Sequence, residues 1–546
     1  MKKISIIIAA LAFTLASCEK DDLLELKQTT RESDKTESTD EIHEGEIQLG
    51  DKYESPLLLK NMQRAADTLS KKSGLRSAVI LEPTHLYVRF LPKDSAEYEQ
   101  LVADSILDVT PYPLDYELTE GTVYHDKSLP YDSYQWQYAV VPVDYDIAAV
   151  GIQSEKLEEL YMPDGILDED EDEEEDEDTS TLRSASVSPS TEFSLSQLLN
   201  EAERQTEKGA TTLKSKWRPG ATIKAYDNVV GGMIPLRGVK VRICVLGFIK
   251  THKYTNENGN VSFSKRRRSA SYSIEWEDDK WDIRDNGTQA YYNGPRQEKW
   301  WNLNIGTGTQ KSLHYSAIHR ALYEYYHGDN CGFTRPSKDL KISYREGSDP
   351  DKTASGVTNA KKVRTWSWIA SPIKIFGESA KTGKIFDVRS VLHTTLHELT
   401  HASHIMRMSK NDYDKVKDYI RDSWADFAAW KISQNIYLKI KTNAYIDSIN
   451  LNYQNQKWTC ISNPKYSPLF IDIYDDFNQK EKFESSVYID DNIFGYTISS
   501  MNENLTSFHN ISDVESFLKN KSYKPQWIQN STINKFLDFY KNIWEN

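Results

Sequence analysis

The most constraining feature of the chain is the segment His397-Glu398-Leu399-Thr400-His401, an H-E-x-x-H motif inside a stretch with helical spacing. Histidines four residues apart lie one turn apart on the same helix face, so both imidazoles can bind one metal ion, here expected to be Zn²⁺. Glu398 faces the same ion and can take a proton from water bound to it. Apolar residues recur beside the histidines at the spacing of a buried helix side: Val391, Leu392, Leu396, Leu399, Ala402 and Ile405. We therefore predict a metal-binding helix; the alternative is a helix whose histidines only form hydrogen bonds.

A second helix is predicted over residues 412–430, with Ile420 and Trp424 on its buried side. Asp422 and Asp426 are four residues apart, so both carboxylates can point toward the metal helix. The third ligand is expected from one of these two aspartates, and their spacing alone leaves the choice open.

With these two segments the chain resembles the thermolysin-like zincins (gluzincins), zinc peptidases in which the helix after H-E-x-x-H carries a ligand and, four residues later, an aspartate. The resemblance covers about fifty residues. It implies that His397, His401 and Asp422 are the metal ligands of a Zn²⁺ cofactor and that Glu398 is the catalytic base. It also implies that Asp426 holds the second ring nitrogen of His397. The family usually has glutamate where this chain has the shorter Asp422, so Asp426 stays open as the alternative ligand.

Other polar residues near the motif are given supporting or surface roles. His393 and His404 are expected on the surface or behind the ligands. The elongated motif of the metzincin family needs glycine at 404 and histidine at 407, and His404 and Arg407 exclude it. Tyr496 is a candidate donor to the developing oxyanion, a role that zincins give to a tyrosine or histidine.

The N-terminus has the pattern of a bacterial secretory signal over residues 1–18, with two lysines before an apolar run too short to span a membrane. Leu15-Ala-Ser-Cys18 resembles a lipobox, which implies that Cys18 becomes a lipidated N-terminus and anchors the chain without a spanning helix. The following Glu19-Lys-Asp-Asp22 resembles the export signal of Bacteroidetes surface lipoproteins. That resemblance implies an outer membrane lipoprotein facing the cell exterior, with a periplasm-facing lipoprotein as the alternative. Residues 19–45 are polar and predict a flexible tether.

Charge and cysteine content exclude several classes of protein. The net charge is −15, but most of the excess lies in an unbroken acidic run over residues 168–178, which predicts a solvated linker. The chain has no basic face, so no nucleic-acid partner is expected. Cys244, Cys331 and Cys460 would remain after processing and permit at most one internal disulfide, which excludes a disulfide framework.

The periodicity along the chain predicts a multidomain fold. We expect a small α+β N-terminal domain over residues 46–163, then an acidic linker and helical connection over 164–216. An antiparallel β-sandwich is expected over 217–280, and a mainly helical, zincin-like α+β domain over 300–546. The sandwich segment, with Gly-Val-Lys-Val-Arg followed by Thr-Asn-Glu-Asn-Gly-Asn-Val-Ser-Phe, resembles the carboxypeptidase regulatory-like fold. That resemblance implies an accessory domain without catalytic residues.

Within the last domain, three further elements are predicted. Residues 312–326 have helical spacing, and His314 and His319 are expected to be ordinary residues on different sides of that helix. Residues 365–376 are predicted to be a strand, a candidate for the edge strand that holds extended substrate in zincins. Ser512 is predicted to cap a C-terminal helix.

Two functions compete at this point. The first is a surface-anchored zinc metallopeptidase that cleaves extracellular polypeptides or glycoproteins, with its membrane contact through the lipid anchor alone. The second is a non-catalytic surface lipoprotein, an adhesin or a glycan- or protein-binding scaffold with a structural zincin-like core. The 13 tryptophans and 32 tyrosines favour the second slightly, whereas the intact Glu398 favours the first.

Overall fold

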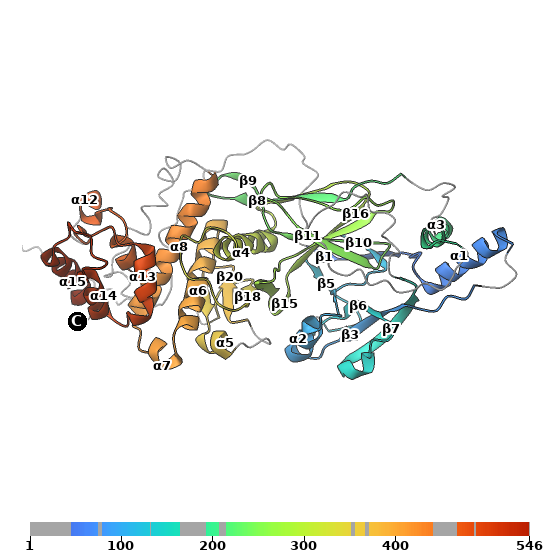
Figure 1. The fold of residues 1–546 in the computed structure, drawn as a ribbon, viewed down its shortest axis with the longest axis horizontal. Coiled ribbons are helices and arrows are strands. Elements are labelled where there is room, and N and C mark those ends of the chain that lie inside the picture. The colour runs from blue at the N-terminus through green and yellow to red at the C-terminus, as the bar shows by residue number, and fades with distance from the viewer. Residues whose placement is uncertain are drawn as a thin grey trace, which may run out of the picture.

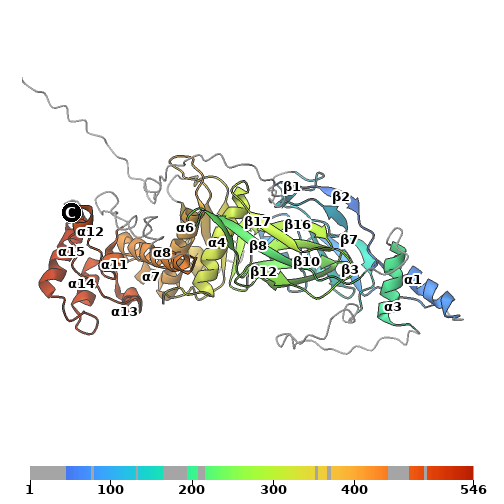
Figure 2. The same cartoon turned by 90° about the horizontal axis from the view of Figure 1, so that it is seen from above.

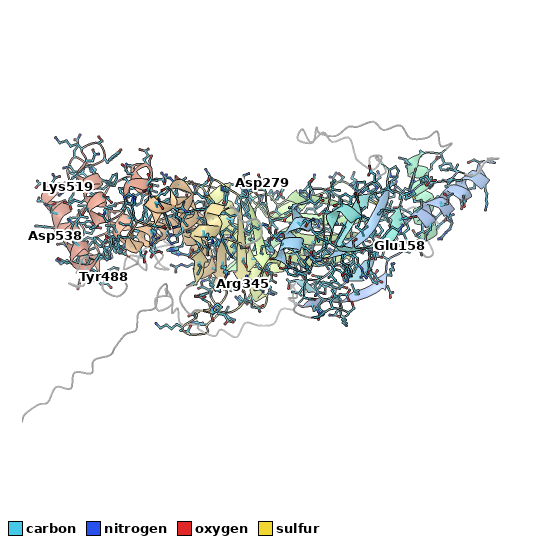
Figure 3. All side chains as sticks on the ribbon, turned by 90° about the horizontal axis from the view of Figure 1, so that it is seen from below. Glu158, Asp279, Arg345, Tyr488, Lys519 and Asp538 are labelled. Atoms are coloured by element: carbon cyan, nitrogen blue, oxygen red, sulfur yellow. The ribbon has the colours of Figure 1, made fainter. Side chains whose placement is uncertain are left out.

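The computed structural model describes residues 45–74, 79–130, 133–163, 193–206, 215–350, 355–365, 371–440, 467–484 and 488–544. Over these ranges the protein is an elongated α+β molecule with several sheets, and its first and last helices lie at opposite ends (Figure 1, Figure 2). Figure 3 shows Lys519 and Asp538 near the C-terminal end and Glu158 toward the other. Cys18 with the signal, nearly all of the tether, the acidic run and Cys460 lie outside the described residues. No helix within the described ranges is long and apolar enough to cross a membrane.

The N-terminal part is built on an antiparallel three-stranded sheet with strand order β6-β3-β7. Its central strand alternates, so that Val88 and Phe90 pack with Leu101 of α2 while Tyr87 joins a second core with Met62 of α1. This part contains both helices and strands, as an α+β fold requires. Its elements are β1 (Glu46–Ile47), β2 (Leu49–Lys52), α1 (Leu59–Lys72), β3 (His85–Leu91), α2 (Ser95–Ala103), β4 (Tyr116–Leu118), β5 (Val123–Tyr124), β6 (Gln137–Pro142), η2 (Ile147–Val150), β7 (Gln153–Leu160) and α3 (Leu195–Thr206).

Two four-stranded sheets follow, one with order β11-β10-β13-β16 and one with β12-β8-β17 and β9 paired to β8. Their elements are β8 (Gly220–Asp227), β9 (Gly232–Pro235), β10 (Lys240–Val245), β11 (Ile249–Tyr254), β12 (Asn260–Ser262), β13 (Ala270–Glu275), β16 (Tyr291–Gln297) and β17 (Trp301–Ile305). Both sheets therefore continue beyond the predicted boundary at residue 280. The pairing is not purely antiparallel as predicted, because β17 runs parallel to β8.

A five-stranded sheet with order β15-β14-β18-β20-β19 adjoins this region. Its elements are β14 (Trp281–Asp285), β15 (Thr288–Gln289), β18 (Leu340–Arg345), β19 (Gly356–Thr358) and β20 (Ile373–Phe376). The three inner strands are parallel, and β19 lies antiparallel to β20 at one edge. Of the predicted strand over residues 365–376, residues 366–370 lie outside the described part of the chain. Thr365 ends α5, and Ile373–Phe376 form β20, which is an inner strand and not the predicted edge strand. The edge strand beside β20 is β19, which is too short to carry a periodic signal.

Helices complete the molecule beside this sheet. They are α4 (Gln310–Tyr326), α5 (Ala360–Thr365), α6 (Val388–Arg407), α7 (Lys410–Tyr413), α8 (Asp418–Ile440), α11 (Leu469–Asp472), α12 (Gln479–Phe483), α13 (Ile498–Asn504), η4 (Leu505–Ser507), α14 (Ile511–Lys519) and α15 (Asn530–Trp544). Helix α6 packs against α4, α8 and the strands β19 and β20. The predicted helix over 412–430 is divided between α7 and α8. The cap of α14 is Asn510 with Asp513, not Ser512.

Candidate metal centre

Helix α6 carries the H-E-x-x-H motif through the interior of the molecule. Its N-terminus is capped by Asp387, whose carboxylate accepts a hydrogen bond of 2.7 Å from the backbone N–H of Ser390. The helix is covered by other elements on most sides, so both polar and apolar residues of its middle turns are buried. His397 and Glu398 are each 3% exposed. Buried polar side chains of this kind must be satisfied by neighbours or by a ligand.

His397 is held from behind by helix α8. Its Nδ1 lies 3.0 Å from Oδ1 of Asp426, and both side chains are buried. A carboxylate at this distance accepts the Nδ1–H, which leaves the lone pair on Nε2. The opposite ring nitrogen of His397 is therefore prepared to act as a ligand.

His401 and Asp422 meet His397 at its Nε2 side. The Nε2 atom of His401 lies 2.9 Å from Nε2 of His397 and 3.2 Å from Oδ1 of Asp422. Two ligands of a tetrahedral zinc ion, each about 2.1 Å from it, stand about 3.4 Å apart. These two separations are shorter than this by about half an ångström or less, and all three donor atoms lie within 4.8 Å of one another, so they fit one Zn²⁺. His401 and Asp422 are partly exposed, with side-chain exposures of 12% and 17%, so the site is open on their side.

The local charge of the centre favours a cation. Burial lowers the pKa of His401, but the carboxylates of Asp422 and Glu398 outweigh burial and raise this pKa above its ordinary value. The His401 imidazole therefore favours its protonated, charged form when no other cation is near. A bound metal ion would supply the positive charge directly.

The carboxylate of Glu398 is oriented by the edge strand. Oε2 of Glu398 accepts a hydrogen bond of 2.7 Å from the hydroxyl of Thr358 in β19. The same hydroxyl lies 3.0 Å from the main-chain oxygen of Glu398. Sequence reasoning missed Thr358, because a three-residue strand carries no recognisable pattern.

Tyr413 lies beside the centre, a position that sequence reasoning missed. Burial raises the pKa of its hydroxyl to about 12, with smaller effects from Arg421, which lowers it, and from the carboxylates of Asp422 and Glu398, which raise it further. Its ring lies 5.1 Å from the Arg421 guanidinium carbon and packs edge-on to His404, with the ring centroids 5.3 Å apart. The residue ends the short helix α7, whereas the sequence placed it inside a longer helix. Only a break between α7 and α8, which the sequence prediction did not include, would have indicated that Tyr413 is separate from the longer helix.

The remaining predicted residues lie elsewhere or in other roles. Tyr496 is 1% exposed, and its hydroxyl donates to the main-chain oxygen of Leu518 at 2.6 Å, so its prediction as the oxyanion donor is wrong. His404 is 1% exposed and lies behind the site rather than on the surface, and burial lowers its pKa to about 3. His314 is buried and bonds to Tyr344 and to the Phe386 main chain, as expected for a structural residue.

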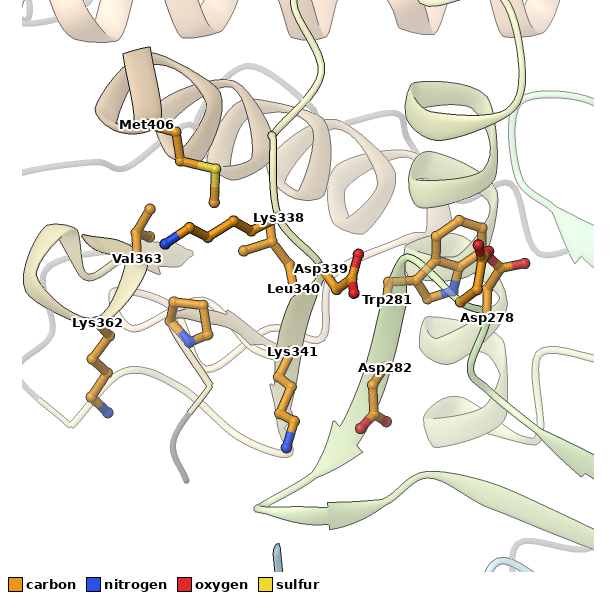
Figure 4. A pocket seen from close by; sticks show the side chains of 12 residues that line it. Asp278, Trp281, Asp282, Lys338, Asp339, Leu340, Lys341, Lys362, Val363 and Met406 are labelled. Atoms are coloured by element: carbon orange, nitrogen blue, oxygen red, sulfur yellow. The ribbon is translucent and has the colours of Figure 1, made fainter. Parts of the chain in front are cut away.

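A second group with metal-ligand chemistry lies near the start of β14. It consists of Asp278, Asp279 and His327, and Nε2 of His327 lies 3.0 Å from a carboxylate oxygen of Asp278. The adjoining cavity of about 240 Å³ has Trp281 and Asp278 on one side and Lys362 on the other (Figure 4). Asp279 and His327 are exposed to solvent, which already hydrates their polar atoms, so no metal is assigned to this group.

The centre is thus assembled from short segments of β19, α6, α7 and α8. Comparisons with protein-family models, with curated proteins and with solved structures found no match to this chain. The chemistry of the centre is therefore inferred from its residues and their arrangement.

Proposed function

We propose that the protein is a zinc-dependent hydrolase, and specifically a metallopeptidase acting on extracellular polypeptides or glycoproteins. One observation carries the proposal: three donor atoms of His397, His401 and Asp422 converge beside the buried carboxylate of Glu398. Two imidazoles, one carboxylate and an open side are the composition of catalytic rather than structural zinc sites.

In the proposed reaction, a Zn²⁺ ion held by these ligands would act as a Lewis acid toward a carbonyl and toward water. Glu398 accepts the proton of the attacking water and later returns it to the leaving nitrogen. Asp426 keeps the ring of His397 in one orientation throughout. Tyr413, protonated at neutral pH because its pKa is about 12, is the donor we propose for the developing oxyanion.

The edge strand supports a polypeptide substrate. Among the described strands, β20 is the one paired with β19, so the other edge of β19 is left without a described neighbour. An extended peptide can pair with such an edge through its backbone, which would lay the scissile bond beside α6. Val357 points away from α6 and is 38% exposed.

The proposal extends to the architecture around the centre. The part from the five-stranded sheet to the C-terminus would be the zincin-like domain. The paired sheets over β8 to β17 would be the accessory domain with the carboxypeptidase regulatory-like fold. Lipidation of Cys18 would hold the protein in the outer membrane, facing the exterior in the proposed arrangement and the periplasm in the alternative.

A binding scaffold without catalysis is the second candidate, and one observation favours it. Trp527 is 65% exposed and Phe494 is 37% exposed, and their ring centroids lie 6.0 Å apart. Exposed aromatic rings of this kind suit the recognition of a glycan or a partner protein. A scaffold would bind zinc without turnover, or bind none.

A comparison of peptide cleavage by the wild type and by Glu398→Gln distinguishes the metallopeptidase from the scaffold. The metallopeptidase predicts that both proteins bind zinc, that the wild type cleaves members of a mixed peptide library, and that the variant does not. Trp527→Ala, which removes one ring of the exposed aromatic pair, is the control variant and should leave cleavage unchanged. Equal behaviour of wild type and Glu398→Gln in the presence of zinc would favour the scaffold.

A further inference from the structure

Strand β19 presents an unusual inner face to helix α6. Residues two apart in a strand face the same side, so Gly356 and Thr358 both face α6 while Val357 faces away. The register with β20 pairs Gly356 with Ile375 and Thr358 with Ile373, which fixes the strand against the sheet. The inner face of this strand therefore consists of a residue with no side chain and a residue with a hydroxyl.

Thr358 and Gly356 contact different oxygens of the Glu398 carboxylate. Thr358 donates to Oε2 at 2.7 Å. Gly356 lies against the other oxygen, since a Cβ built on it would stand 3.1 Å from Oε1 and 2.9 Å from Cγ of Glu398. Among the described residues, no group donates a hydrogen bond to Oε1. One oxygen is thus held, and the other is left free beside a position where any side chain would displace it.

We propose that Thr358 is a positioning residue that orients the general base Glu398. Its hydrogen bond holds Oε2, so that Oε1 is the oxygen that takes the proton from water. This inference rests on the proposed function and adds that the two oxygens of Glu398 have different roles: Oε2 accepts the hydrogen bond from Thr358, and Oε1 accepts the proton. Gly356 contributes to the same arrangement, because the absence of a side chain at this position leaves room for Glu398 to present Oε1.

The hydroxyl of Thr358 can serve both protonation states of Glu398. It has one proton and two acceptors within reach, Oε2 at 2.7 Å and the main-chain oxygen of Glu398 at 3.0 Å. While Glu398 is ionised, the charge-assisted bond to Oε2 is the stronger one. When Oε1 has gained the proton, Oε2 becomes a weaker acceptor, and the main-chain oxygen is available instead. The hydroxyl therefore has an acceptor in both protonation states of Glu398, and it holds Oε2 in the ionised state, in which Glu398 accepts the proton.

The first test compares kinetics of Thr358→Val and Thr358→Ser with the wild type. Loss of the hydroxyl should lower kcat by about 10- to 100-fold, because misplacement of a reacting group by about 1 Å has an effect of that size. KM and zinc content should stay at wild-type values, and Thr358→Ser should recover most of kcat. Thr255→Val is the matched control: its buried hydroxyl, just after β11, donates to the main-chain oxygen of Leu236 at 2.6 Å, and its loss should leave kcat unchanged.

A second test needs neither zinc nor turnover. Thermal unfolding of the metal-free protein is measured for Thr358→Val, Glu398→Ala and the double variant. The inference predicts that Thr358→Val lowers the unfolding midpoint in the wild type and lowers it less in the Glu398→Ala background, because the side-chain acceptor is gone. Equal shifts in both backgrounds would overturn the inference. So would an active wild type whose kcat is unchanged in Thr358→Val or is not recovered by Thr358→Ser.

The two tests also separate failure of the inference from failure of the function. A zinc-loaded wild type that cleaves no peptide would overturn the proposed peptidase and the catalytic role of Thr358 with it. In that case coupled unfolding would still establish the bond between Thr358 and Glu398 as a structural one.

Discussion

At the scale of single residues, the two aspartates of α8 have different partners. Asp422 reaches the open side of the centre, where its carboxylate stands 3.2 Å from Nε2 of His401. Asp426 stands behind His397, at the nitrogen that cannot bind the same ion as Nε2. The short side chain of Asp422 reaches His401 because α6 and α8 pack directly against one another.

This difference predicts an order of zinc affinities. Asp422→Ala removes a proposed ligand and should weaken zinc binding by far more than Asp426→Ala, which should weaken it by about 10- to 100-fold as expected for a supporting residue. Competition with a chelating dye measures both. Asp538→Ala, which changes an exposed aspartate at the C-terminal end, is the control and should bind zinc like the wild type (Figure 3). The reverse order would make Asp426 the ligand.

At the scale of elements, the C-terminal helices are joined around buried carboxyl groups. Asp472 at the end of α11 accepts a hydrogen bond of 2.5 Å from the hydroxyl of Tyr540 in α15. Asp491 is 6% exposed; its Oδ1 accepts from the N–H of Ile493 at 3.1 Å, and its Oδ2 is buried without a hydrogen-bond partner in the described part of the chain. Burial, and then the charge of Asp472, raises the pKa of Asp491 well above its ordinary value.

Asp491→Asn should therefore stabilise the protein at neutral pH. A carboxyl group whose pKa is raised in the folded state binds its proton more tightly there. The stability of the wild type consequently falls as pH rises from the ordinary carboxyl pKa through the raised value. The variant should be more stable by about 1–3 kcal/mol at pH 8, the usual cost of an unsatisfied buried group, and the gain should vanish near pH 4. Urea unfolding at the two pH values measures the difference, and a variant less stable at pH 8 would contradict the account.

At the scale of the whole molecule, strand β14 connects the N-terminal part to the helical part. Its residues alternate, so that Trp281 packs against Tyr326 of α4 while Arg284 faces Glu99 of α2. Arg284 is 1% exposed, pairs with Asp282 in its own strand and lies 3.6 Å from Glu99. Buried charges of this kind tie the two parts together only while each has its partner.

Replacement of Arg284 tests this connection. Arg284→Met leaves the carboxylate of Asp282, which is largely but not fully buried, without this ion-pair partner and should lower the free energy of unfolding by about 3–5 kcal/mol. Lys480→Met is the control, since its ion pair with Asp490 is exposed, and its loss should cost about 1 kcal/mol or less. Urea unfolding measures both. Similar losses in the two variants would show that the buried pair does not stabilise the connection.

The sequence predicted what local spacing determines and missed what distant segments bring together. The histidines of α6 and the aspartates of α8 were found because residues four apart share a helix face. Thr358 and Tyr413 were missed because only the packing of β19 and α7 brings them to the centre. The segment predicted as a sandwich was ended too early, because β14 and β15 follow β13 in the chain before β16 returns to pair with β13.

The central claim is that His397, His401 and Asp422 hold one zinc ion. Its most direct test is the zinc content of protein purified without added metal, measured by mass spectrometry for the wild type and for His401→Ala. The account predicts about one zinc per chain in the wild type and almost none in the variant, because two ligands alone hold zinc weakly. A wild type without zinc, or a variant with as much zinc as the wild type, would contradict it.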